Sequence, residues 1–279
     1  MLGTRIITAI FLVTGLLAGL FWLPAPLMSL VFVGIVALAA WEWAGLLQAS
    51  PTIRIVYALV TGGLCLALLA AGLSEKLPEG LLSGLWLLAV MFWVCLVPLW
   101  FRYQWRVSHG VAGWLVGGLL LVPSWAAMVT LHQRSPWLLL AAMALVWVAD
   151  IAAYFAGRTL GRHKLAPTIS PGKTWEGAVG AVAGVLLYAA ILARETGVWS
   201  TLGGQQWLVW LLGLLVLTAV SIIGDLFESL AKRQAGVKDS SALLPGHGGV
   251  LDRIDSLTST LPLVALAVTQ GALSGVAGF

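Results

Sequence analysis

Apolar stretches of about 20 residues follow one another along almost the whole chain. The hydrocarbon core of a bilayer is about 30 Å thick, and an α-helix needs about 20 apolar residues to cross it. A helix also pairs its own backbone polar groups, as a lipid environment requires. We therefore predict an all-α fold, a polytopic transmembrane helical bundle of about nine spans, over residues 5–23, 27–48, 53–73, 81–101, 112–131, 136–157, 175–194, 207–230 and 257–276.

The composition agrees with lipid as the main solvent. Hydrophobic residues make up 60% of the 279 residues and charged residues only 9%, whereas a soluble domain carries about 25% charged residues. Glycine, of which there are 32, lets transmembrane helices approach closely, and tryptophan, of which there are 15, collects at the membrane surface. The net charge of +4 is modest, so no nucleic-acid partner is expected.

The basic residues orient the predicted spans, because cytoplasmic loops are enriched in lysine and arginine. With a cytoplasmic N-terminus, 12 basic residues fall on the cytoplasmic side: Arg5, Arg54, Arg102, Arg106, Arg158, Arg162, Lys164, Lys173, Lys232, Arg233, Lys238 and Arg253. The opposite side then holds three, Lys76, Arg134 and Arg194. We therefore predict a cytoplasmic N-terminus and a C-terminus outside.

The charge is concentrated in the second half of the chain. Of the 26 acidic and basic residues, 17 lie within residues 150–255. We divide the chain into N-terminal transmembrane helices, 1–135, and C-terminal transmembrane helices, 136–279. The second part carries two long cytoplasmic loops, 157–174 and 231–256, in which we expect the functional site.

Three aspartates of the second part suggest a metal site. Asp225 lies near the end of a predicted span, where an acid costs roughly 3 kcal/mol. Asp252 and Asp255 are three residues apart, so a helix places both on one face. Three carboxylates without cysteine form a hard oxygen set that suits Mg²⁺. Ordinary solvated loop charges are the alternative, which the position of Asp225 and Asp252 at the membrane boundary disfavours.

Cations interleave with these acids around a glycine-rich turn at residues 246–249. They are Lys232, Arg233, Lys238 and Arg253. Cations, a metal ion and exposed backbone N–H groups together suit a polyphosphate. His247, inside the turn, is either a ligand or phosphate donor or a residue that shapes the turn.

A second basic strip lies in the first loop. Arg158, Arg162, Lys164 and Lys173 would lie beside the lipid headgroups, where they suit an anionic lipid or nucleotide phosphates. Lys173 and Thr174 resemble the end of a P-loop, but Pro167 stands where that motif needs glycine, which excludes it. The alternative is that these charges only orient the chain in the membrane.

The stretch SLAKRQAGVKDSSALLPGHGGVLDRID, residues 229–255, resembles the signature of the phosphatidate cytidylyltransferases, also called CDP-diacylglycerol synthases. The residues that match the signature are Ser229, Lys232, Arg233, Lys238, Asp239, His247, Gly248, Gly249, Asp252, Arg253 and Asp255. The upstream stretch LAPTISPGKTWEG, residues 165–177, is also similar to the family, although asparagine is common at the position of Gly172.

The resemblance implies the reaction of CTP with phosphatidate to give CDP-diacylglycerol and pyrophosphate, in phospholipid biosynthesis. It implies Mg²⁺, with Asp225, Asp252 and Asp255 as metal ligands; a second, monovalent cation stays open. Asp225, Lys238, Asp252 and Arg253 are the expected catalytic residues. The expected substrate-binding residues are Arg162, Lys164, Ser170, Lys173, Lys232, Arg233, His247, Gly248 and Gly249.

These inferences place the protein in a membrane, expected to be the bacterial inner membrane, with lipid around it and the active site facing the cytoplasm. The glycine-rich spans would also suit a homo-oligomer.

Other functions are weighed against this interpretation. A cytidylyltransferase or a CTP-dependent kinase acting on another lipid would share the same residue types. An ion-coupled transporter would account for the intramembrane acids Glu42, Asp150 and Asp225, but the chain shows no pair of related halves. CDP-alcohol phosphotransferases need an Asp-Gly pair, which the sequence lacks. No role for Glu42 follows from the sequence.

Overall fold

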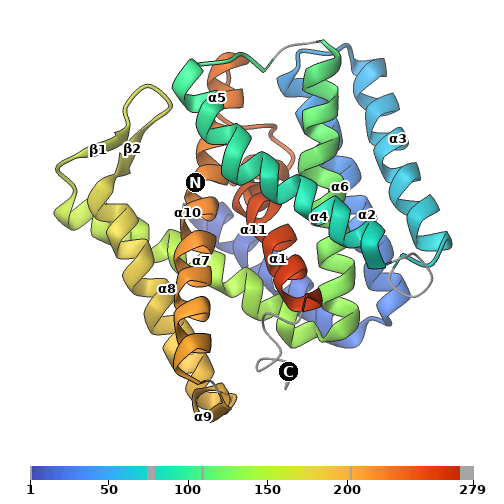
Figure 1. Cartoon of the computed structure of the whole chain (residues 1–279). Helices are drawn as coiled ribbons and strands as arrows, with labels where there is room; N and C mark the ends of the chain where they lie inside the picture. Colours follow the sequence, from blue (N-terminus) through green and yellow to red (C-terminus); the bar gives the residue numbers. More distant parts are fainter. Residues whose placement is uncertain (1, 74–78, 108–109, 202, 271–279) are drawn as a thin grey trace.

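The computed structural model describes residues 2–73, 79–107, 110–201 and 203–270. Within them the chain is helical except for one hairpin and the connecting segments (Figure 1). The first half comprises α1 (Leu2–Trp22), α2 (Ala25–Leu46), α3 (Pro51–Ala70), α4 (Glu79–Met91), the π-helical turn η1 (Phe92–Leu96), α5 (Val97–Tyr103) and α6 (Val111–Arg134). The second half comprises α7 (Pro136–Leu160), β1 (Lys164–Ala166), β2 (Ser170–Thr174), α8 (Trp175–Glu195), α9 (Val198–Thr201), α10 (Gly204–Gln234) and α11 (Leu251–Thr269).

The all-α, polytopic membrane fold is confirmed. In the described part of the chain every predicted span lies on helix, and the end of the ninth, 271–276, falls outside the described residues. Seven helices are long and apolar enough to cross a membrane, and the apolar part of α1, Ile6–Trp22, is shorter. α11 is not among the seven: its first half carries three charged side chains and four hydroxyl groups. The number of crossings and the orientation therefore stay predictions.

α11 occupies the centre of the bundle, in contact with α2, α4, α6, α7 and α10 (Figure 1). The four hydroxyl groups in its first half are buried, and two of them join it to α10. Ser259 Oγ donates to the Val220 carbonyl at 2.9 Å, and Ser256 Oγ donates to the Ser221 carbonyl at 3.2 Å. These bonds lie about one turn from Asp225 on α10, and so they bring that residue towards the start of α11.

α7 and α8 form the closest helix pair beside this centre. Small residues face one another across it, and a methyl group on Gly180 would lie 2.3 Å from Ala156 Cβ and 3.1 Å from the Ala152 carbonyl oxygen. Lipid gives little hydrophobic drive for helix association, so close backbone packing of this kind holds transmembrane helices together. The pair thereby fixes one wall of the functional site.

We expect Gly180→Ala to lower the free energy of unfolding by about 1–3 kcal/mol, because the new methyl group overpacks the α7–α8 contact. Gly213→Ala is the matched control, since Gly213 of α10 has open space around it. Thermal unfolding of both purified variants in the same detergent measures the difference. Equal stability of the two variants would contradict the close packing at Gly180.

The predicted loop 157–174 is more ordered than the sequence indicated. α7 continues to Leu160, and β1 and β2 then pair as an antiparallel hairpin with Lys164 opposite Thr174. Thr174 Oγ1 caps α8 by accepting from the Gly177 N–H at 3.1 Å. Glu176 accepts from the His163 ring at 2.6 Å. The two ends of the hairpin are thus fastened to α8, and the hairpin extends beyond the helices on one side (Figure 1).

Candidate active site

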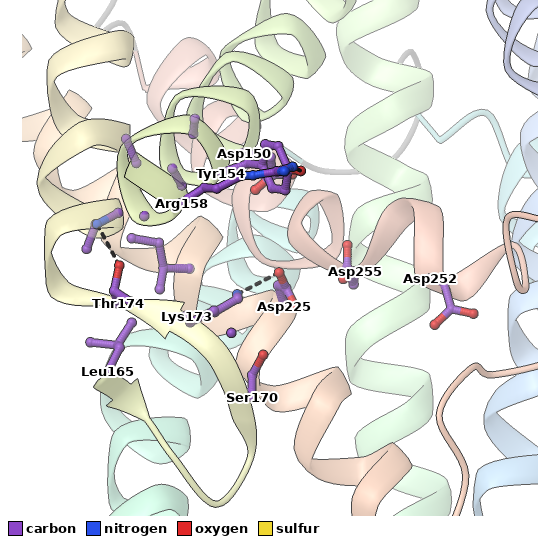
Figure 2. A pocket seen from close by; sticks show the side chains of 18 of the residues that line it. Asp150, Tyr154, Arg158, Leu165, Ser170, Lys173, Thr174, Asp225, Asp252 and Asp255 are labelled. Atoms are coloured by element: carbon purple, nitrogen blue, oxygen red, sulfur yellow. Dashed lines mark hydrogen bonds and ion pairs between the residues drawn. The ribbon is translucent and has the colours of Figure 1, made fainter. Parts of the chain in front are cut away.

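A cavity of about 710 Å³ lies between α7, α8, the hairpin, α10 and α11 (Figure 2). All five aspartates of the chain line it, although they come from four different segments: Asp150, Asp225, Asp239, Asp252 and Asp255. Four cations, from α7, β2, α10 and α11, accompany them: Arg158, Lys173, Lys232 and Arg253. The two charged segments that the sequence singled out therefore converge on one site.

Asp225 of α10 joins the hairpin to the helices. Its Oδ2 lies 2.6 Å from Lys173 Nζ of β2, and both side chains are partly exposed, at 29% and 25%. Its Oδ1 accepts from Ser229 Oγ at 3.2 Å, one turn further along α10. Figure 2 shows this ion pair in the middle of the cavity. The pair is accessible to a ligand that enters there.

Asp255 and Asp150 complete the acidic part of the cavity. Asp255 lies in the first turns of α11, and Asp150 lies on α7. Asp255 is close enough to Asp225 and Asp150 for the negative charges to repel one another, and Asp150 is also within the electrostatic influence of Lys173 and Arg253. Such mutual repulsion favours the binding of a cation among these carboxylates.

Asp252 has a different set of partners and points away from Asp225 (Figure 2). Its Oδ1 lies 2.5 Å from Lys232 Nζ. Its Oδ2 accepts from the Gly249 N–H at 2.7 Å and from the Ser240 N–H and hydroxyl at 2.9 and 2.8 Å. Burial alone would raise the pKa of this carboxyl group, but the hydrogen bonds from Lys232 and from two backbone N–H groups outweigh it and lower the pKa.

Lys232 also pairs with Glu228, one turn earlier on α10. The Glu228 side chain is only 5% exposed and that of Lys232 12% exposed. The sequence interpretation did not include Glu228. The spacing of Glu228 could have indicated its role. It lies three residues after Asp225 and four before Lys232, so a helix places all three side chains on one face.

A second cavity of about 590 Å³ adjoins the first. Its lining includes Lys238, His247 and Gly248, and it shares Asp239 and Arg253 with the first cavity. The turn that forms it depends on glycine: Gly248 has φ +81°, and a methyl group there would lie 2.7 Å from Asp252 Oδ2. His247 Nδ1 is buried without a hydrogen-bond partner in the described part of the chain.

The predicted substrate-binding residues separate into two groups. Ser170, Lys173 and Lys232 line the first cavity, whereas His247 and Gly248 line the second. The structure places the others outside both linings: Arg162, Lys164, Arg233 and Gly249. Two of these have structural contacts instead, since Arg233 Nε donates to the Ile169 carbonyl at 3.4 Å and the Gly249 N–H donates to Asp252.

The four predicted catalytic residues all border the two cavities. Asp225 and Asp252 line the first, Lys238 lines the second, and Arg253 lines both. The predicted metal ligands Asp225, Asp252 and Asp255 line the same cavity. Within the described residues, however, no three acidic, histidine or cysteine side chains are grouped closely enough to hold a metal ion by themselves.

An apolar helical bundle whose acids and cations converge on one cavity defines an integral membrane protein with a charged internal site. The chain belongs to the cytidylyltransferase family, whose model matches residues 3–270.

Curated relatives agree with this family over nearly their full length. A protein of Pseudomonas aeruginosa is 43% identical over 95% of this chain and 96% of its own. One of Haemophilus influenzae is 36% identical over 94% and 96%, and one of Brucella suis is 39% identical over 95% and 92%. All three relatives are named phosphatidate cytidylyltransferase.

Proposed function

We propose that this protein transfers CMP from CTP to phosphatidate, giving CDP-diacylglycerol and pyrophosphate for phospholipid synthesis. The observation that carries the proposal is the convergence of all five aspartates and four cations on one cavity of a membrane-embedded cytidylyltransferase. The names of the similar proteins supply the two substrates. The charges of the cavity suit substrates that both carry phosphate.

The proposed reaction needs little help from a general base. A phosphate oxygen of phosphatidate forms a bond to the α-phosphorus of CTP, the α–β bridging P–O bond breaks, and pyrophosphate leaves with the electron pair. A phosphomonoester has a second pKa of about 6, so the attacking group is already largely ionised near neutral pH. The protein must instead neutralise two anions and hold them in line.

The cations are placed for this task. Lys173 is held at the cavity by Asp225 and can turn to a phosphate that enters beside it. Arg253 borders both cavities, so it can contact phosphate groups on either side of the boundary. We assign Lys173 to the first cavity, Lys238 to the second, and Arg253 to the point where the two substrates meet.

Magnesium is the cofactor that we propose, and the donor set fits it. Asp225 and Asp255 offer carboxylate oxygens in one cavity, and Mg²⁺ is usually held by one or two carboxylates together with substrate phosphates and water. A complete protein cage is therefore not needed. Asp252 can join them only by exchanging Lys232 for the ion. When bound, the ion would neutralise charge on the phosphates of CTP.

The same proposal includes nine spans with the N-terminus in the cytoplasm and the C-terminus outside. Residues 158–173 and 232–253 together carry eight of the 15 basic residues of the chain, and positive charge favours the cytoplasmic side. The site would then open to the cytoplasmic face of a bacterial inner membrane. The division at residue 135 and a homo-oligomer stay predictions.

The direct test supplies detergent-solubilised protein with phosphatidate, Mg²⁺ and CTP labelled in either the α- or the γ-phosphate. We expect the α-label alone to enter a lipid-soluble cytidine product. EDTA should abolish the product and added Mg²⁺ should restore it.

Other outcomes would overturn the proposal in different ways. Entry of the γ-label into lipid would indicate a CTP-dependent kinase. Product formed only with an isoprenoid phosphate would indicate another acceptor lipid. Solute transport without CTP turnover would indicate a transporter.

A further inference from the structure

Glu42 is a fully buried acid on α2 that the proposed chemistry does not use. Its side chain is 0% exposed. It lies about 200 residues away in sequence from the groups that it contacts. An ionised carboxyl group in the protein interior is costly unless hydrogen bonds satisfy its oxygens, so its contacts indicate what it does.

Four donors satisfy the Glu42 carboxylate. The backbone N–H groups of Val250 and Leu251 donate to Oε1 and Oε2 at 2.9 and 2.6 Å. The Ser241 hydroxyl donates to Oε1 at 2.6 Å, and the Ser240 hydroxyl, whose single hydrogen is shared between Glu42 and Asp252, lies 3.1 Å from Oε2. All four donors belong to the segment between α10 and α11 or to the first residues of α11.

These bonds cap α11 from another helix. α11 begins at Leu251, and Val250, at its N-cap position, supplies no capping side chain. The first N–H groups of a helix need an acceptor, and a negative charge at this end also interacts favourably with the helix dipole. Glu42 provides both the acceptor and the negative charge. The N–H groups that it caps belong to the two residues immediately before Asp252 and Arg253 in the chain.

Ser240 extends this contact to the active site. Its hydroxyl oxygen lies 3.1 Å from Glu42 Oε2 and 2.8 Å from Asp252 Oδ2. Its backbone N–H also donates to Asp252 Oδ2. Ser240 is therefore held between two carboxylates: that of Asp252, which lines the first cavity, and that of Glu42, which does not.

α2 is a firm support for Glu42. The neighbouring Trp43 is 1% exposed, and its Nε1 donates to the Gly113 carbonyl near the start of α6 at 3.0 Å. Its ring stacks against Phe227 of α10 at a centroid distance of 6.4 Å. The Glu42 carboxylate is thus fixed relative to the helix that carries Asp225.

We propose that Glu42 is a positioning residue: it fixes the start of α11 and thereby sets the positions of Asp252 and Arg253 in the two cavities. Glu42 itself lines neither cavity among the described residues. Its influence on catalysis, which rests on the proposed function, acts through the backbone and hydroxyl groups that it holds.

The test compares Glu42→Gln with Glu195→Gln in the full-length protein. Glu195 ends α8 and is exposed, so it is a matched control. Glutamine keeps the shape of the side chain but loses the charge and turns an NH₂ group towards hydrogen-bond donors. We expect kcat/KM for CTP to fall about 10- to 100-fold in folded Glu42→Gln, the effect of losing about one hydrogen bond to a charged group.

Kinetics must be measured well below the unfolding temperature of each variant. If Glu42 only stabilised the fold, Glu42→Gln would unfold at a lower temperature while its folded fraction kept wild-type kcat and KM. That outcome would overturn the proposal.

Amide hydrogen exchange gives a second readout that needs no turnover. We expect faster exchange in peptides covering residues 248–253 of Glu42→Gln and no change in Glu195→Gln. Unchanged exchange there would refute the positioning role even if activity fell. A wild-type protein without CTP turnover would contradict the proposed function, while the exchange measurement would still test Glu42.

Ser241→Ala covers the case in which Glu42→Gln does not fold. It removes one of the four donors and leaves the carboxylate in place, and we expect kcat/KM to fall about 3- to 10-fold. Wild-type kinetic constants in Ser241→Ala would then overturn the proposal.

Discussion

Asp225→Asn is expected to lower kcat/KM for CTP by about 100- to 1,000-fold, the usual effect of removing one group that stabilises charge in the transition state. The substitution removes a carboxylate that we propose as a metal ligand. It also removes the counter-ion that holds Lys173 at the cavity, 2.6 Å away. Initial rates over a range of CTP concentrations, measured at saturating phosphatidate, give kcat/KM for the variant and the wild type.

The magnesium dependence of this variant separates the two roles of Asp225. We expect half-maximal activity to require more Mg²⁺ than in the wild type, because one carboxylate ligand is lost. All five aspartates of the chain line the cavity, so the control is again the exposed Glu195→Gln. Wild-type activity of Asp225→Asn at wild-type Mg²⁺ concentrations would refute the metal assignment.

Lys232→Met is expected to lower the free energy of unfolding by about 3–5 kcal/mol, because removing one partner leaves buried charges uncompensated. The lysine contacts two acids whose side chains are almost fully buried, Glu228 at 5% and Asp252 at 4% exposure. Activity should be lost as well, since Asp252 would lose the partner of its Oδ1. Unfolding in detergent, followed by tryptophan fluorescence, measures the stability.

A double variant identifies the cause of this loss. Glu228→Gln introduced into Lys232→Met removes one of the two unpaired charges, so part of the stability should return. Arg233→Met is the matched control, because Arg233 is exposed and makes hydrogen bonds of 3.4 Å, so its loss should cost about 1 kcal/mol or less. Equal losses in Lys232→Met and Arg233→Met would show that the buried ion pairs contribute little.

The helices were predictable because their cause is local. Twenty consecutive apolar residues in lipid can satisfy their backbone only within a helix, and each predicted span lies on helix in the described part of the chain. The hairpin was not predictable in the same way. Its strands have three and five residues, too short for an alternating pattern. Contacts such as that of His163 with Glu176 fasten it.

The site was predictable as a set of residue types and only partly as a geometry. Acids at membrane depth are costly, so Asp225 and its neighbours stood out in an apolar chain. The ion pair between Asp225 and Lys173 joins residues on α10 and the hairpin, and spacing along the chain carries no information about it. The same is true of Asp252, whose oxygens face Lys232 and the glycine turn while Asp225 faces the hairpin.

The amino-acid sequence is enough to identify a helical membrane protein of the cytidylyltransferase type, because the length of the hydrophobic stretches and the charged signature are properties of the chain. Which acid meets which base depends on how the helices pack in three dimensions. Glu42 is the clearest case: it was an unexplained acid in an apolar span, and it caps a helix that begins 209 residues later. A buried carboxylate takes whichever donors the packing of distant helices brings to it, and no local pattern encodes that choice.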